Sequence, residues 1–141
     1  MSWLYRGAIF TEDMIPEGAV GFIYMMTAII DNKLVKYIGK KNFFANVKTK
    51  LSKKALPTDK RLKKYKRIKK FTYKDYYSSN EVLIQARKNG IDIEREILLI
   101  CNSKIDLSYQ EVKHQFAYNV LEDDSYLNRN ILGRYFKKQN N

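Results

Sequence analysis

The chain has 141 residues, 45% of them hydrophobic, which is enough for one compact core, and 27 Lys and Arg against 15 acids give it a net charge of +12. Its apolar runs fall short of the ~18 residues of a membrane span, and its start lacks the pattern of a secretory signal, so we expect a cytoplasmic protein without membrane contact. Its single cysteine, Cys101, excludes an intramolecular disulfide and a cysteine-based zinc site.

A β-hairpin is predicted in the first third of the chain. The segment GFIYMMTAII at 21–30 is rich in β-formers, and LVKYIG at 34–39 resumes after the polar turn 31–33. These runs predict two antiparallel strands.

The next segment carries most of the excess charge, because fourteen Lys or Arg and one acid lie between Lys40 and Lys70. Apolar residues at helical spacing from Phe44 to Leu51 predict a basic helix, and residues 60–77 are predicted as helix or ordered loop. A charge run is often only a solvated face, but this density indicates a polyanionic partner and salt-sensitive binding of nucleic acid.

Two helices and a third strand are predicted in the second half. Asn80 as N-cap and Gly90 as terminator predict a helix at 80–89, and the apolar residues of 91–101 predict a central strand. The pattern Ser108-x-x-Glu111 is a capping box and predicts the start of the last helix.

Together these elements predict a single domain over residues 1–141 with a basic insertion at about 55–78. The fold class is α/β (α+β), with a three-stranded antiparallel sheet flanked by helices.

Short motifs accompany these elements. Gly21-Phe22-Ile23-Tyr24 and Tyr37-Ile38-Gly39 lie on the hairpin. WLYRG precedes the hairpin, and DYYSSN, REIL, YQEVKHQ and YLN follow it in this order along the chain. In this order they resemble the GIY-YIG nucleases, in particular the small phage-encoded type related to homing endonucleases, over nearly the whole chain. The resemblance implies an endonuclease that hydrolyses phosphodiester bonds of DNA by nicking or double-strand cutting, as monomer or homodimer. If the protein is phage-encoded, it would act in the cytoplasm of the bacterial host.

The resemblance also implies the chemistry of the site. Tyr24 is the candidate general base, Tyr37 would orient phosphate or water, and Glu111 would hold one divalent cation, Mg²⁺ with Mn²⁺ as a substitute. Carboxylate oxygen is a hard ligand that suits Mg²⁺, although Glu111 also fits its place in the capping box. His114 lies one helical turn further on and is a further candidate.

Asn128 in the YLN motif matches the asparagine that closes the family's site, and Asn130 is the competing register. The family's arginine, which clamps the scissile phosphate, falls at Val47 in this chain. Lys48 would take its place after a one-residue shift, with Asn46 or Lys50 as alternatives, but lysine lacks the planar fork of arginine. The expected DNA contacts are Lys40, Lys41, Lys50, Lys53, Lys54, Lys63, Lys64 and Arg67.

Two other functions are compatible with this sequence. One is a catalytically weakened DNA-binding protein on the same scaffold, favoured by Val47 at the arginine position. The other is a basic module that binds RNA or a protein partner. Metal-dependent cleavage of DNA separates the enzyme from both alternatives.

Overall fold

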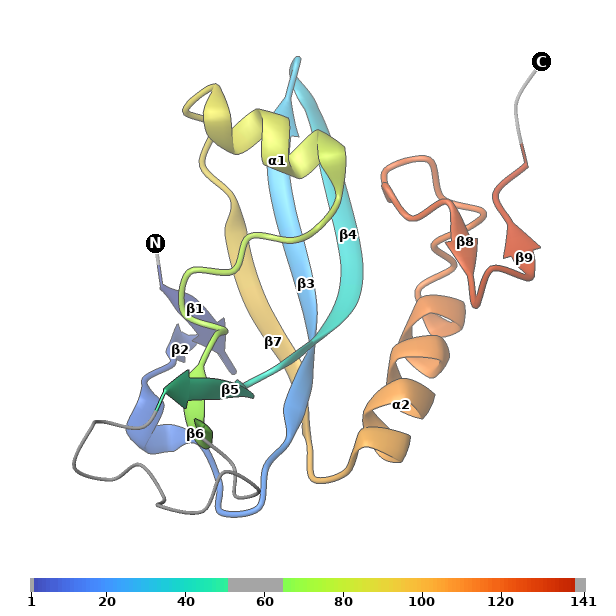
Figure 1. Ribbon diagram of the computed structural model, residues 1–141. Coiled ribbons are helices and arrows are strands. Elements are labelled where there is room, and N and C mark those ends of the chain that lie inside the picture. The colour runs from blue at the N-terminus through green and yellow to red at the C-terminus, as the bar shows by residue number, and fades with distance from the viewer. Residues whose placement is uncertain (1, 51–64, 139–141) are drawn as a thin grey trace, which may run out of the picture.

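The computed structural model describes residues 2–50 and 65–138 (Figure 1). No helix in these two ranges is long and apolar enough to cross a membrane. The elements in chain order are β1 (Trp3–Tyr5), β2 (Ala8–Ile9), the short 3-10 helix η1 (Glu12–Met14), β3 (Gly21–Ile30), β4 (Lys33–Asn42), β5 (Phe44–Lys50), β6 (Tyr65–Phe71), α1 (Glu81–Lys88), β7 (Glu94–Cys101), α2 (Lys104–Ala117), β8 (Asn130–Ile131) and β9 (Tyr135–Phe136).

The main sheet has the strand order β2-β1-β7-β3-β4. Its three long strands are antiparallel and correspond to the three predicted from the sequence, which confirms the α+β class. The short strands β1 and β2 extend the sheet beyond the prediction, and β1 lies parallel to β7. Three residues of β1 are too few for a periodic signal, and their partner lies about ninety residues away along the chain.

The β3–β4 hairpin closes through two residues, Asp31 and Asn32, with φ of 51° and 63°. Two successive positive φ angles match the twist of the paired strands, so this turn sets the register of the hairpin. β4 continues to Asn42, three residues beyond the predicted end at 39. Gly39 therefore lies inside the strand, and Lys40 and Lys41 continue β4 instead of following a turn.

The alternation of side chains along β3 builds a separate core on each face of the sheet. Phe22 and Tyr24 point to the face that carries Leu83 of α1. Ile23 points to the opposite face, where it joins Leu107 of α2. The two helices therefore cover opposite faces of the sheet.

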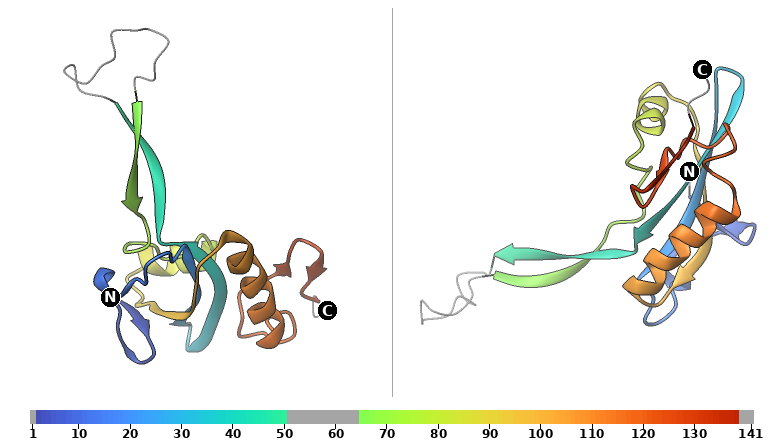
Figure 2. Two further views of the ribbon diagram at one scale, coloured as in Figure 1. Left: turned by 90° about the horizontal axis from the view of Figure 1, so that it is seen from below. Right: turned by 90° about the vertical axis from the view of Figure 1, so that its right-hand side faces the viewer.

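The predicted basic helix after Phe44 is wrong, because this segment is strand β5, paired with β6 along its whole length. Val47 pairs with Ile68, and the rings of Phe44 and Phe71 lie 6.4 Å apart. The spacing of the apolar residues alone suggested a helix. It gave no sign of a strand, because the partners in these two pairs lie more than twenty residues further along the chain. β6 likewise replaces helix or loop over 65–71. Figure 2 shows β5 and β6, named here the β5–β6 ribbon, extending away from the body of the protein.

The two helices differ in how well their starts were predicted. α1 begins at the expected cap, where Asn80 Oδ1 accepts a hydrogen bond from the backbone N–H of Val82 at 3.0 Å. α2 begins earlier than expected, because Ser103 is its N-cap and accepts from Asp106 N–H at 3.0 Å. Ser108 therefore lies inside α2, and the predicted capping box is wrong. Glu111 has no capping role here.

Residues 125–128 cover the outer edge of β4. The backbone N–H of Lys36 donates to Ser125 O at 2.8 Å, and that of Leu127 donates to Lys36 O at 2.7 Å. The buried side chain of Asn128 accepts from Ile38 N–H at 3.1 Å and donates to Ile38 O at 2.8 Å. An amide side chain thus pairs with the edge strand in the way a neighbouring strand would.

We predict that Asn128→Ala destabilises the protein. The change leaves the buried N–H of Ile38 without its acceptor, which costs about 1–3 kcal/mol. Asn130→Ala is the matched control, because Asn130 is exposed and its side chain only accepts from Gly133 N–H at 3.0 Å. Urea denaturation of the two variants measures the difference, and equal stability of both would contradict the pairing of Asn128 with β4.

Candidate active site

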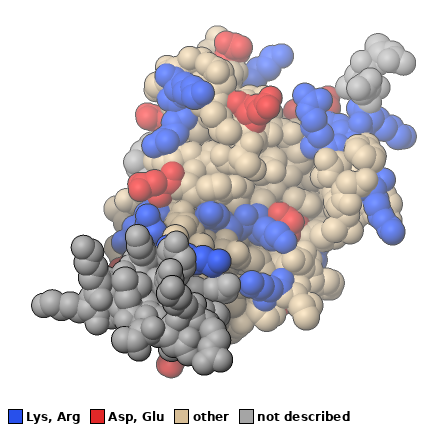
Figure 3. Space-filling view, in the orientation of Figure 1, with Lys and Arg blue, Asp and Glu red and all other residues tan. Residues whose placement is uncertain are grey.

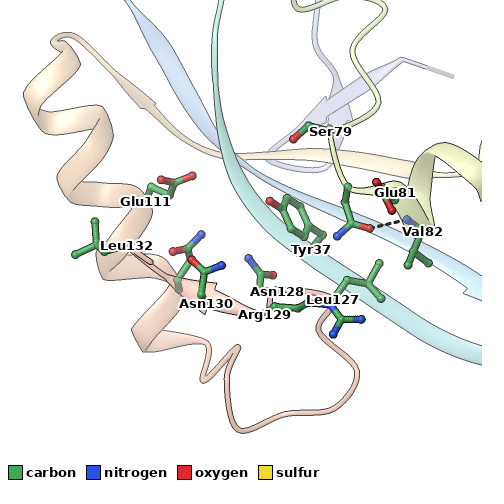
Figure 4. Close-up of a pocket in the computed structure, with 12 residues that line it drawn as sticks. Tyr37, Ser79, Glu81, Val82, Glu111, Leu127, Asn128, Arg129, Asn130 and Leu132 are labelled. Carbon is green, nitrogen blue, oxygen red and sulfur yellow. Dashed lines mark hydrogen bonds between the residues drawn. The ribbon is translucent and has the colours of Figure 1, made fainter. Parts of the chain in front are cut away.

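A cavity of about 550 Å³ lies at the edge of β4 (Figure 4). It opens between the start of α1, strand β4, helix α2 and the chain after α2. Figure 4 shows Glu111 and Tyr37 facing this space from α2 and β4. The residues that line it are Tyr37, Ser79, Asn80, Glu81, Val82, Glu111, Gln115, Leu127, Asn128, Arg129, Asn130 and Leu132.

Glu111 is held at the edge of β4 by Lys40. The carboxyl is partly buried, and burial raises its pKa, while the Lys40 ammonium and a backbone hydrogen bond from Lys40 act in the opposite direction. Lys40 Nζ also donates to Ser108 Oγ at 2.9 Å, one helical turn before Glu111. Because alternate residues of a strand present their backbone groups to the same edge, Lys40 follows Lys36 and Ile38 in this position. Glu111 therefore continues the edge pairing that Asn128 begins.

Tyr37 is the tyrosine that lines the cavity. It is partly buried, and its pKa is raised by burial, by the negative charge of Glu111 and by Tyr76. Its ring lies 6.3 Å from that of Tyr24. Tyr37 and Glu111 line the same cavity, so the phenol and the carboxyl belong to one site.

Tyr24 lies behind Tyr37 and is only 1% exposed. Its hydroxyl is 3.3 Å from the Tyr76 hydroxyl, and burial followed by Tyr76 raises its pKa strongly. The hydroxyl end of the ring lies against Gly39, where an added Cβ atom would come within 2.6 Å of the Tyr24 hydroxyl oxygen. A larger residue at position 39 would clash with Tyr24. Glycine is therefore needed here for close approach of the Tyr24 side chain inside the sheet, and not for a turn of the backbone. A bulge in the pairing of β3 with β7 between Ile23 and Tyr24 lies beside it.

The family model described as "Putative endonuclease segE, GIY-YIG domain" matches residues 3–131. The chain belongs to this GIY-YIG family. Neither the curated proteins nor the solved structures contain a match. Membership places the chain among nuclease domains that act on DNA, and the match, from β1 to β8, includes every cavity-lining residue except Leu132.

The segment DYYSSN contributes groups to this GIY-YIG site that had no role in the sequence analysis. Tyr76 covers the Tyr24 hydroxyl, a hydrogen bond with Ser78 partly lowers the pKa of Tyr24, and Ser79 lines the cavity. Buried Arg95 of β7 fixes the segment, because its Nη1 donates to Tyr76 O at 2.9 Å. The order of the motif along the chain was the only sequence signal for these residues.

Besides Tyr24, which lies behind Tyr37, two more predicted catalytic residues do not line the cavity. His114 lies on α2, but its Nδ1 is 2.6 Å from Gln110 O of the same helix, and its ring stacks on Tyr118. Lys48 is exposed on the β5–β6 ribbon, as is Asn46, so neither replaces the family's arginine at the cavity.

The predicted DNA-binding residues lie in different parts of the structure. Lys40 contacts Ser108, and Lys41 Nζ lies 4.5 Å from the ring centre of Tyr76. Lys50 and Arg67 belong to β5 and β6. Lys53, Lys54, Lys63 and Lys64 lie outside the described residues, as do residues 55–64 of the predicted insertion. Figure 3 shows basic side chains spread over the face seen in Figure 1, with a group near its centre.

A guanidinium does line the cavity, but it belongs to Arg129, which was not a candidate from the sequence. Among the described residues that line the cavity, it is the one basic side chain. Arg129 directly follows Asn128, so the pairing of Asn128 with Ile38 also holds the backbone of Arg129 near the edge of β4.

The donors at the cavity fit a magnesium ion only if water and substrate supply most of its ligands. Over the described ranges, no group of three or more His, Cys, Asp or Glu side chains could hold a metal. Mg²⁺ in nucleotide-binding sites commonly keeps several waters and uses one or two carboxylates. The raised pKa of Glu111 means that its negative charge is incompletely balanced, which also fits a cation as partner.

We predict that Glu111→Gln stabilises the metal-free protein at neutral pH. The pKa of Glu111 is raised in the folded state, so the folded protein holds this proton to higher pH than the unfolded chain does. The free energy of unfolding therefore decreases as the pH rises from about 4 through the raised pKa of this group. The variant escapes this loss, so its advantage over the unmodified protein grows with pH.

Thermal denaturation at a series of pH values in EDTA measures this effect. Glu17→Gln, at an exposed position, controls for the substitution itself. An advantage of Glu111→Gln that shrinks with rising pH would show that the carboxyl is stabilised in its charged form, contrary to the burial of this site.

Proposed function

We propose that this protein is a metal-dependent DNA endonuclease in which Glu111 binds one divalent cation at the edge of β4. The observation that supports this most is the position of Glu111, a partly buried carboxylate that faces Tyr37 across a common cavity. Family membership supplies the class of reaction. Mg²⁺ is the expected cation, and Mn²⁺ substitutes because it accepts the same oxygen ligands.

When bound, the cation would neutralise charge on the scissile phosphate and stabilise the departing oxygen. Glu111 would be its protein ligand, with water and phosphate oxygens as the others. Asn128 and Lys40 hold the elements that carry this carboxylate, and Arg129 would contact a non-bridging phosphate oxygen through its guanidinium. These groups neutralise the charge that builds up on the phosphate during attack.

The two tyrosines would have different tasks. Tyr37 lines the cavity and would orient the attacking water or the phosphate through its hydroxyl. Tyr24 would take the proton of the water, for which its hydroxyl must become accessible and lose its own proton. Because Tyr76 covers it and raises its pKa, we propose that DNA displaces Tyr76 and that the nearby ammonium of Lys41 favours the ionised form of Tyr24.

We predict Mg²⁺-dependent nicking or cutting of plasmid DNA that Glu111→Ala lowers at least about a hundredfold, since a charge-stabilising group is removed from the site. Tyr24→Phe and Tyr37→Phe lower it as well. Glu122→Ala, at an exposed position, is the control and cleaves normally. A metal titration on gels, with sequencing of the ends, measures the activity, and undiminished cleavage by Glu111→Ala would refute the site.

The second candidate function is a DNA-binding protein whose catalysis is weakened. It is favoured by Val47, because valine stands at the position of the family's arginine. Val47 also lies on the β5–β6 ribbon and not at the cavity. This function predicts salt-sensitive binding of DNA without cleavage in Mg²⁺, Mn²⁺ or Co²⁺.

We further predict that Tyr76→Phe shifts the pH profile of cleavage to lower pH. Tyr76 raises the pKa of Tyr24, and a general base acts in its deprotonated form, so removal of the Tyr76 hydroxyl makes that form available at lower pH. Cleavage rates at DNA concentrations well below KM, measured from about pH 6 to pH 10, give the profile of kcat/KM, which reports the free enzyme in which Tyr76 still covers Tyr24. Tyr77→Phe is the neighbouring control, and a profile of Tyr76→Phe that moves to higher pH, or not at all, would exclude Tyr24 as the base.

A further inference from the structure

The β5–β6 ribbon stands apart from the two cores of the protein. Its strands pair from Phe44 with Phe71 to Lys50 with Tyr65, and Figure 2 shows them leaving the body side by side. Val47 and Ile68 form an apolar cross-strand pair, yet they are 39% and 41% exposed. Within the described residues, then, the ribbon has an uncovered surface.

The root of the ribbon is firmly attached. Phe71 packs edge-on against buried Tyr73 at 6.3 Å, and Thr72 N–H donates to Phe43 O at 3.0 Å. The ammonium of Lys69 lies 3.7 Å from the ring centre of Phe44. An isolated two-stranded hairpin is only marginally stable in water, so this anchorage gives the ribbon a fixed direction from the body.

The charge of the ribbon indicates that it binds a polyanion. Its two strands contain six basic residues and no acid, and Lys48, Lys69 and Lys70 are exposed. Like charges on neighbouring strands destabilise a sheet, and phosphate groups would relieve this repulsion. The charge therefore indicates a partner that brings many phosphates along an extended surface.

We propose that the β5–β6 ribbon lies in the major groove of duplex DNA and positions the duplex for cleavage at the cavity, an inference that rests on the proposed nuclease function. Two strands about 4.8 Å apart, with their side chains, fit a groove about 12 Å wide and are too broad for the minor groove of about 6 Å. Seven paired residues extend about 20 Å, which is part of one turn of the duplex.

The side chains of the ribbon suit this position. Lys48, Lys69 and Lys70 contact phosphates along the walls of the groove, which positions the protein without reading sequence. The exposed pair Val47 and Ile68 offers an apolar surface for thymine methyl groups, which only the major groove presents.

Duplex binding by an uncleaving protein tests the lysines. In the Glu111→Gln background and in EDTA, the combined variant Lys48→Ala, Lys69→Ala, Lys70→Ala is compared with Lys33→Ala, Lys88→Ala, Lys104→Ala, which removes the same charge from exposed sites elsewhere. Fluorescence anisotropy over a salt series measures affinity. The ribbon variant should lose at least about tenfold in affinity, and its salt dependence should fall by about two to three in slope, whereas the control loses little.

Chemical protection of the same complex tests the groove. Dimethyl sulfate methylates guanine N7 in the major groove and adenine N3 in the minor groove. We expect protection of N7 over a short stretch, absent with the ribbon variant and present with the control. Equal affinity of the two triple variants, or protection of N3 alone, would overturn the inference. Near-ultraviolet circular dichroism of both variants establishes that they are folded.

These outcomes are independent of the cleavage test. A protein that protects N7 through the ribbon but cleaves no DNA in Mg²⁺, Mn²⁺ or Co²⁺ would refute the nuclease function while the ribbon still binds the major groove. If the ribbon variant cleaves and binds DNA as the unmodified protein does, the proposed DNA contact of the ribbon is refuted and the nuclease function still stands.

Discussion

The structure depends on the way the outer edge of β4 is satisfied. An edge strand presents unpaired backbone groups, which elsewhere invite pairing with another chain. Here the backbone of residues 125–127 pairs with Lys36, the amide of Asn128 pairs with Ile38, and Lys40 donates to Glu111. The same hydrogen bonds close the sheet and bring together the walls of the cavity. Fold stability and the placement of the carboxylate thus have one cause.

The cavity and the layer behind it contain titrating groups whose pKa values are raised by the fold. Glu111 is partly buried with incomplete charge compensation, and Tyr24 and Tyr37 lie close together with raised pKa values. Perturbed titrating groups of this kind gather at functional sites more often than elsewhere, because the partner that relieves them is the substrate or a cation. The pairing of residues 125–128 with β4 holds the elements that carry Glu111 and Tyr37 in place.

The proposed chemistry and the proposed DNA contact occupy different parts of the molecule. The cavity is built from elements that pack on the main sheet, while the β5–β6 ribbon carries a dense run of basic residues away from it. The segment after β6 connects the two, since Tyr73 anchors the root of the ribbon and Tyr76 covers Tyr24. A duplex held by the ribbon would therefore meet the cover of the proposed base directly beside its point of attachment.

Local patterns in the sequence determined the β3–β4 hairpin, α1 and β7, because turn residues, a helix cap and β-forming runs act over a few neighbouring positions. The resemblance to the GIY-YIG nucleases selected Tyr37, Glu111 and Asn128, which the structure brings to one cavity. Only the tertiary structure decided that the segment after Phe44 is a strand, since its partners come from β6. It also decided that α2 starts at Ser103, that Tyr24 is buried under Tyr76, and that Arg129 instead of Lys48 reaches the cavity. Each of these depends on contacts between residues far apart in the chain, and no local pattern records which distant segment will supply the partner.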